Sequence, residues 1–137
     1  MFFLYILLLI MDRAGKLLEL EALAENLLKS QKKSALLKLK VLYFASEYEN
    51  LSVSIIIQKL GMQKSNFALA MAEMEKEGLI EICQAEIDRR CRTVRLTNKG
   101  REMLENYKQE IETCLGATTP QFDACLNTIT DTLNKII

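Results

Sequence analysis

The stretch that decides the fold is residues 51–100, LSVSIIIQKLGMQKSNFALAMAEMEKEGLIEICQAEIDRRCRTVRLTNKG. Its first part predicts a short helix, because Ser52 or Ser54 can cap a helix N-terminus and Gly61 suits the left-handed conformation that ends one. A second helix over Gln63–Glu77 has four apolar residues on one face, Phe67, Ala70, Met71 and Met74. Two short helices joined by a glycine-containing turn are typical of a helix-turn-helix.

Two alternating segments follow the second helix, at Leu79–Gln84 and Arg92–Thr97. Alternation of apolar and polar residues is the period of a β-strand, and the polar segment Ala85–Cys91 between them predicts the tip of a β-hairpin. A helix-turn-helix followed by a hairpin is a winged helix. Its second helix is suited to the DNA major groove, and its hairpin to the flanking minor groove or backbone.

Further helices are predicted on both sides of this motif. Upstream, Asp12–Gln31 is amphipathic, and Ser34–Glu47 is apolar nearly all round, which predicts a helix at the centre of the core. Downstream, Thr97 caps an amphipathic helix that Gly116 ends. Pro120 then opens a final helix with an apolar stripe, Phe122, Leu126, Ile129, Leu133 and Ile136.

The chain begins with an unbroken apolar run, Met1–Met11. It is shorter than the ~20 residues of a membrane-spanning helix, and it lacks the basic start of a signal peptide. Two interpretations remain open: a helix extension buried against a partner, or a start codon assigned upstream of a true start at Met11. A membrane anchor ranks third, and we expect no membrane partner.

The 137 residues fit one domain, and 50% hydrophobic with 26% charged residues excludes a disordered chain. The chain contains no histidine, which excludes a Ser-His-Asp triad and a histidine metal site, so we expect no enzyme and no cofactor. Its four cysteines form no C-x-x-C pair, which favours buried thiols in a reducing cytoplasm. A thiol redox switch at Cys91, or at Cys114 with Cys125, is the alternative.

Net charge is zero, but five basic residues and no acidic ones occur between Arg89 and Lys99. Arginines exposed on a hairpin suit phosphate contacts and a narrow minor groove. In the second helix of the pair, Gln63, Lys64, Ser65 and Asn66 are the polar candidates for base and phosphate contacts, since Gln and Asn bond adenine edges.

Four motifs resemble the MarR family of bacterial transcription regulators: residues 61–67, GMQKSNF; 75–80, EKEGLI; 88–90, DRR; and 96–100, LTNKG. The resemblance implies a homodimeric winged-helix repressor or activator on a palindromic operator of double-stranded DNA, released by a small aromatic or amphipathic effector, and we expect a repressor. It also implies that Asp88 orients Arg90 for a DNA contact. We expect Arg89, Arg92 and Lys64 to contact phosphates. This sequence differs where the family often has Ser, Thr or Arg, since it has Ala68 and Leu69 there.

We therefore predict a mainly α fold with a small β-hairpin wing, a winged helix-turn-helix with N- and C-terminal dimerisation helices. Residues 1–33 would be the apolar extension and first dimerisation helix, 34–100 the DNA-binding domain, and 101–137 the C-terminal dimerisation helices. The protein would be a cytoplasmic homodimer. The alternative functions are a winged-helix protein-interaction module without operator recognition and the thiol redox-sensing regulator.

Overall fold

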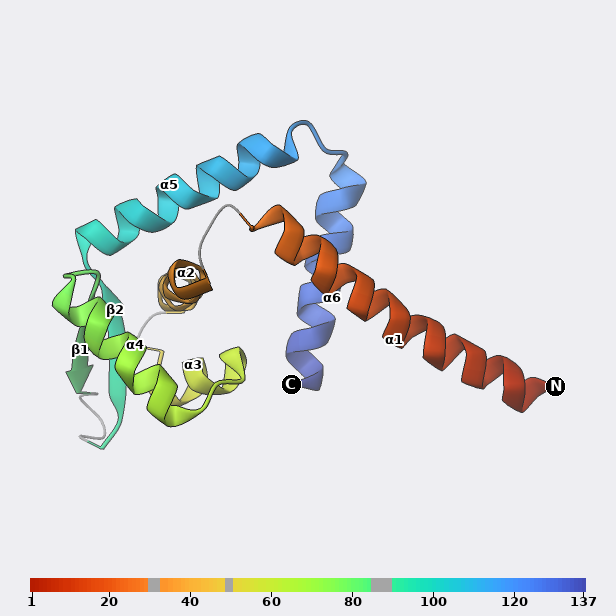
Figure 1. Cartoon of the computed structure of the whole chain (residues 1–137), viewed down its shortest axis with the longest axis horizontal. Coiled ribbons are helices and arrows are strands. Elements are labelled where there is room, and N and C mark those ends of the chain that lie inside the picture. Colours follow the sequence, from red (N-terminus) through yellow and green to blue (C-terminus); the bar gives the residue numbers. More distant parts are fainter. Residues whose placement is uncertain (30–32, 49–50, 85–89) are drawn as a thin grey trace. The chain divides into compact units, whose positions relative to one another are not determined.

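The computed structural model describes residues 1–29, 33–48, 51–84 and 90–137, and the chain divides into two units, Met1–Lys33 and Ser34–Ile137. The first unit consists of one long helix, α1 (Phe2–Leu27) (Figure 1). The apolar run at the start of the chain and the amphipathic stretch after it thus form one continuous helix.

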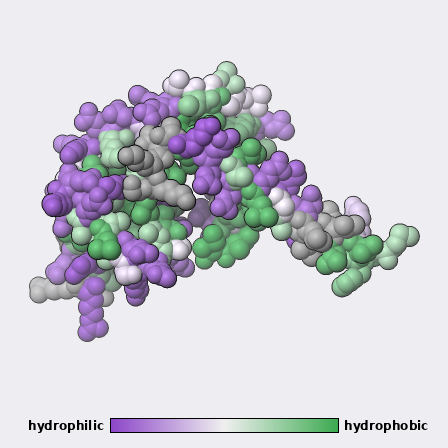
Figure 2. All heavy atoms as spheres, in the orientation of Figure 1, coloured by the Kyte–Doolittle hydropathy of each residue, from purple (hydrophilic) through white to green (hydrophobic). Residues whose placement is uncertain are grey.

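The apolar side chains of α1 that the structure describes are exposed to solvent in the single chain, and Figure 2 shows apolar atoms uncovered at its N-terminal end. They include Phe2, Phe3, Leu4, Leu17, Leu18 and Leu23. Among the residues that the structure describes, no helix is long and apolar enough to cross a membrane.

The second unit contains α2 (Lys33–Glu47, which starts one residue before the division), α3 (Val53–Leu60), α4 (Lys64–Lys76), β1 (Ile80–Gln84), β2 (Arg92–Leu96), α5 (Asn98–Leu115) and α6 (Pro120–Ile136). The two strands pair antiparallel, with Ile80 opposite Leu96 and Gln84 opposite Arg92. Helices α3 and α4 form the predicted pair, and the hairpin follows α4 directly (Figure 1). The prediction of a mainly α winged helix-turn-helix is confirmed.

Local capping explains where these helices begin and end. The Ser52 hydroxyl accepts a hydrogen bond from the Ile55 amide at 3.3 Å, so Ser52, not Ser54, caps α3. Gly61 ends α3 with φ of 64°, a left-handed conformation that glycine adopts without strain. Thr119 caps α6, with Pro120 in its first turn as expected.

The core lies where α2, α3, α4, the hairpin and α5 meet. It is built from Leu39, Val41, Leu42, Leu51, Ile56, Phe67, Met71, Met74, Leu79, Ile80, Val94, Leu96 and Leu104. The prediction for α2 holds on one face only, because Tyr43 is 43% exposed while Val41 and Leu42 are fully buried. The core therefore holds α4 and the hairpin against one scaffold.

The first turn of α5 is fixed to the turn between α4 and β1. The Thr97 hydroxyl donates to the Gly78 carbonyl at 2.6 Å and accepts from the Gly100 amide at 3.1 Å. The Thr97 amide donates to the Leu79 carbonyl at 3.1 Å. A Cβ atom at Gly100 would overlap this same carbonyl oxygen. Residues 96–100, LTNKG, thus combine a helix cap with a close backbone approach that only glycine permits.

A short bridge on the other edge of the hairpin was not predicted. Ser52 pairs with Thr93, and the Val94 amide donates to the Leu51 carbonyl at 3.3 Å. Strand β2 therefore lies between β1 and residues 51–52. This explains why Thr93 is buried next to Val94 in a strand that otherwise alternates.

Candidate nucleic-acid interface

The start of α4 brings the four predicted recognition residues together on one exposed helix end. Gln63 is the N-cap residue in an extended conformation, and its side chain makes no capping hydrogen bond. Lys64, Ser65 and Asn66 form the first turn, and all four residues are exposed. Phe67, which is 1% exposed, anchors this turn to the core. The polar residues thus lie on a rigid, solvent-facing helix terminus.

The acidic residues in the second half of α4 interact with other parts of the protein. Lys38 of α2 donates to a Glu73 carboxylate oxygen at 3.1 Å and to a Glu77 oxygen at 2.8 Å. The hydrogen bond from Lys38 holds the pKa of Glu77 below its usual value, and the bond to Glu77 raises the pKa of Lys38. A Glu75 oxygen accepts from the Ile82 amide at 3.3 Å, so this carboxylate is directed towards the hairpin.

The wing places arginines outward and apolar residues inward. Val94 and Leu96 of β2 are buried, whereas Arg92 and Arg95 are exposed. Arg90 is exposed at the end of the hairpin tip. The predicted residues Asp88 and Arg89 lie outside the described part of the chain, so the orientation of Arg90 by Asp88 stays a prediction.

A small hollow separates the recognition helix from the wing. Its volume is about 270 Å³, and its lining includes Lys64, Ala68 and Ala72 of α4 and Arg92 of β2. One basic residue from each element therefore borders the same depression. The predicted helix residue Lys64 and the predicted wing residue Arg92 are brought together by this arrangement.

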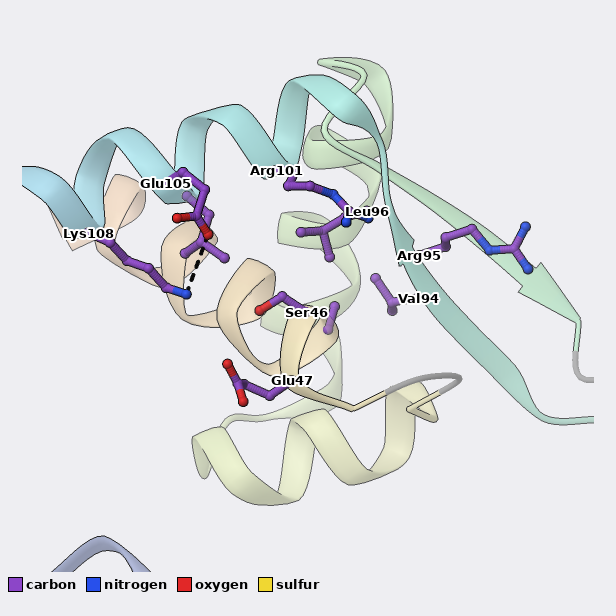
Figure 3. Close-up of a pocket in the computed structure, with 10 residues that line it drawn as sticks. Ser46, Glu47, Val94, Arg95, Leu96, Arg101, Glu105 and Lys108 are labelled. Atoms are coloured by element: carbon purple, nitrogen blue, oxygen red, sulfur yellow. Dashed lines mark ion pairs between the residues drawn. The ribbon is translucent and has the colours of Figure 1, made fainter. Parts of the chain in front are cut away.

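A larger hollow, of about 690 Å³, lies between the end of α2, strand β2 and the first half of α5 (Figure 3). Its apolar floor includes Val94 and Leu96, and the charged residues at its rim are Glu47, Arg101, Glu105 and Lys108, whereas the Arg95 side chain points away from it (Figure 3). Lys108 and Glu105 form an ion pair at 3.6 Å (Figure 3). An apolar floor with charges of both signs at the rim suits a small amphipathic molecule. The sequence analysis did not find this site, because its residues come from three separate segments.

The prediction of buried thiols is wrong. Cys91, Cys114 and Cys125 are exposed in the chain, and Cys83 is partly buried. The physical reason is their position: Cys91 lies next to the hairpin tip, and the other exposed pair occupies outward faces of α5 and α6. Among the described residues, no group of His, Cys, Asp and Glu side chains is arranged to hold a metal ion.

Several solved structures are similar to this chain in their fold. A MarR-family transcriptional regulator from Rhodococcus sp. RHA1 superposes with a TM-score of 0.66 at 23% identity, covering 91% of this chain and 92% of that chain. FabT from Streptococcus pneumoniae, solved in complex with DNA, gives a TM-score of 0.55 at 18% identity, covering 72% of each chain. The PcaV regulator from Streptomyces coelicolor, solved with its natural ligand, gives 0.55 at 16% identity, covering 89% of each chain.

No family model matches the sequence, and no curated protein matches it. The similarity to solved structures establishes the fold: this chain has the winged-helix fold of MarR-type regulators, as its motifs indicated.

Proposed function

We propose that this protein is a sequence-specific DNA-binding transcription regulator that acts as a homodimer. The observation that carries the proposal is the joint placement of Gln63, Lys64, Ser65 and Asn66 on an exposed helix start and of exposed arginines on the adjoining hairpin. In this proposal α4 enters the major groove, with Lys64 on a phosphate, and Arg90 reaches the neighbouring minor groove. A structurally similar protein was solved in complex with DNA, which supports DNA as the partner.

The proposed dimer uses the apolar faces of the terminal helices. Phe122, Leu126 and Ile129 of α6 are 40%, 45% and 37% exposed in the single chain, and described apolar side chains of α1 such as Phe3 and Leu18 are exposed too. A two-fold interface would cover these faces, and a palindromic operator with half-sites roughly one helical turn apart would match its symmetry. We propose that such binding represses transcription.

The proposed effector is a small aromatic or amphipathic molecule that binds in the hollow between α2, β2 and α5. Residues of β2 form part of its wall, so an occupant would contact the strand that carries Arg92 and Arg95. Binding there would change the position of the wing and weaken operator affinity. The ligand complex of PcaV supports a role for small molecules in proteins of this fold.

Selection of bound fragments from random-sequence DNA, followed by footprinting, tests the proposal. We expect a protected inverted repeat. Arg90→Ala should weaken binding to all sequences and reduce the slope of log affinity against log salt by about two, because the homodimer loses one cation beside the phosphates of each half-site. Lys135→Ala, at the end of α6, is the matched control and should leave the slope unchanged.

The dimer is tested separately by the sedimentation of an Ile129→Glu variant. A charge in the proposed interface should give monomers and abolish binding to the full inverted repeat. A wild-type chain that sediments as a monomer, or random DNA from which no sequence is enriched, would contradict the proposal.

A further inference from the structure

The most exposed apolar side chain of the helix-turn-helix lies on its recognition helix. Leu69 is 72% exposed, whereas Phe67, Met71 and Met74 of the same helix are 1%, 3% and 0% exposed. At 100° per residue, Phe67 and Met71 are each turned 200° from Leu69, so Leu69 lies opposite the buried face. It is therefore at the centre of the surface that α4 turns to solvent.

The neighbours of Leu69 leave this surface accessible. Ala68 and Ala72 are both exposed and small, and Ser65 lies one turn earlier on the same side of the helix. The carboxylates of the second half are engaged at its flanks, with Glu73 on Lys38 and Glu75 on the Ile82 amide. A partner molecule can thus approach the Leu69 side chain closely.

The exposed groups near this apolar centre include cations, together with Glu73 and Glu75, whose carboxylates bond Lys38 and the Ile82 amide. Lys64 lies one turn before Ala68 on α4, and Arg92 faces the same small hollow from the wing. Arg90 and Arg95 of the hairpin are exposed as well. An apolar centre bordered by cations complements the major groove, where phosphates flank the base edges. It complements an apolar protein surface less well, because these cations would have to lose their solvation there.

The floor of the major groove offers one apolar group, the C5 methyl of thymine; the other groups at the base edges donate or accept hydrogen bonds. Resting on the function proposed above, we propose that Leu69 determines specificity by contacting a thymine methyl group in each half-site, one turn further along α4 than the polar contacts of Ser65 and Asn66. The two kinds of contact then read adjacent parts of one half-site.

Replacing thymine by deoxyuridine tests this, because it removes the methyl group and keeps every hydrogen-bonding group. The operator selected from random DNA by the full-length wild-type chain is synthesised with each thymine replaced in turn. At one thymine per half-site we expect wild-type affinity to fall about fourfold, the effect of losing one buried methyl. Leu69→Ala should bind the thymine and deoxyuridine operators equally. Lys64→Ala, the control, should weaken both and keep the fourfold ratio.

A second variant separates a lost contact from a lost fold. Leu69→Gln places a bidentate partner for adenine at the same position, so selection with this variant should replace the thymine by adenine in the enriched motif. An unfolded variant loses binding without gaining a new preference.

The outcomes are distinguishable. A selected motif in which no thymine methyl matters, or a Leu69→Ala variant that still discriminates fourfold, overturns the role of Leu69 and leaves the regulator intact. Failure of the wild-type chain to enrich any sequence overturns both, and would make this face a protein-docking surface instead.

Discussion

Gly100→Ala tests the close packing of α5 against the turn between α4 and β1. The added Cβ atom would overlap the carbonyl oxygen of Leu79 and lie 3.1 Å from the Cδ2 atom of Leu42. The Leu79 carbonyl is held by the Thr97 amide at 3.1 Å, and Thr97 is held in turn by the Gly78 carbonyl. Relief of the overlap therefore has to displace a hydrogen-bonded turn.

The magnitude follows from two opposing effects. Overpacking a tight contact costs about 1–3 kcal/mol, and loss of one strained hydrogen bond costs about 1 kcal/mol more. Alanine regains about 1 kcal/mol of helix propensity over glycine. We expect a net loss of about 2 kcal/mol in the free energy of unfolding, which lowers Tm by roughly 8 °C for a unit of this size.

Urea denaturation followed by circular dichroism measures this loss. The matched control is Gly15→Ala in α1, where a Cβ atom meets nothing within 4 Å. That variant should keep its stability or gain up to about 1 kcal/mol, since alanine favours the helix. Equal stability of Gly100→Ala and wild type would refute the close approach of α5 to the α4–β1 turn.

Two further predictions concern polar groups around the core. Lys38→Met keeps the apolar stem but removes the ion pairs with Glu73 and Glu77, and should cost about 1 kcal/mol of stability at neutral pH. Because the pKa of Glu77 is lowered and that of Lys38 is raised in the folded chain, the difference from wild type should persist between about pH 5 and 10. It should disappear in urea titrations as pH falls through the folded-state pKa of Glu77 or rises through that of Lys38. Tyr107→Phe should leave stability unchanged or raise it by about 1 kcal/mol in thermal unfolding, because the Tyr107 hydroxyl is buried and has no hydrogen-bond partner among the described residues. A loss of stability greater than about 1 kcal/mol would reveal a partner for the hydroxyl in the assembled protein.

Local signals account for most of the predicted fold. Ser52, Gly61 and Thr97 each act within one helical turn of their own position, so their effects can be read without knowing the tertiary structure. The strand periodicity of residues 92–96 likewise placed Val94 and Leu96 inside. The helix-turn-helix and its wing were predictable for this reason.

Contacts between distant segments were not predictable from the same signals. Lys38 and Glu77 are 39 residues apart in sequence, and no local pattern pairs them. The burial of Thr93 depends on a bridge to Ser52 and on a hydrogen bond to the Cys83 carbonyl. The candidate effector hollow joins α2, β2 and α5 and needed the packed core to become visible.

Two features of α4 and its C-cap favour the alternative of an interaction module: the acidic residues Glu73, Glu75 and Glu77, and a leucine where polar or basic residues are common. In the structure, both features are compatible with DNA binding. Two carboxylates share the Lys38 ammonium group and the third accepts from a backbone amide, so part of their charge is offset within the protein. Leu69 lies beside the exposed residues Ala68 and Ala72 at the centre of the exposed face. A recognition helix with polar residues in its first turn and an apolar contact in its second can read hydrogen-bonding edges and methyl groups in turn, so the leucine is a reason to test operator recognition and not a reason to discard it.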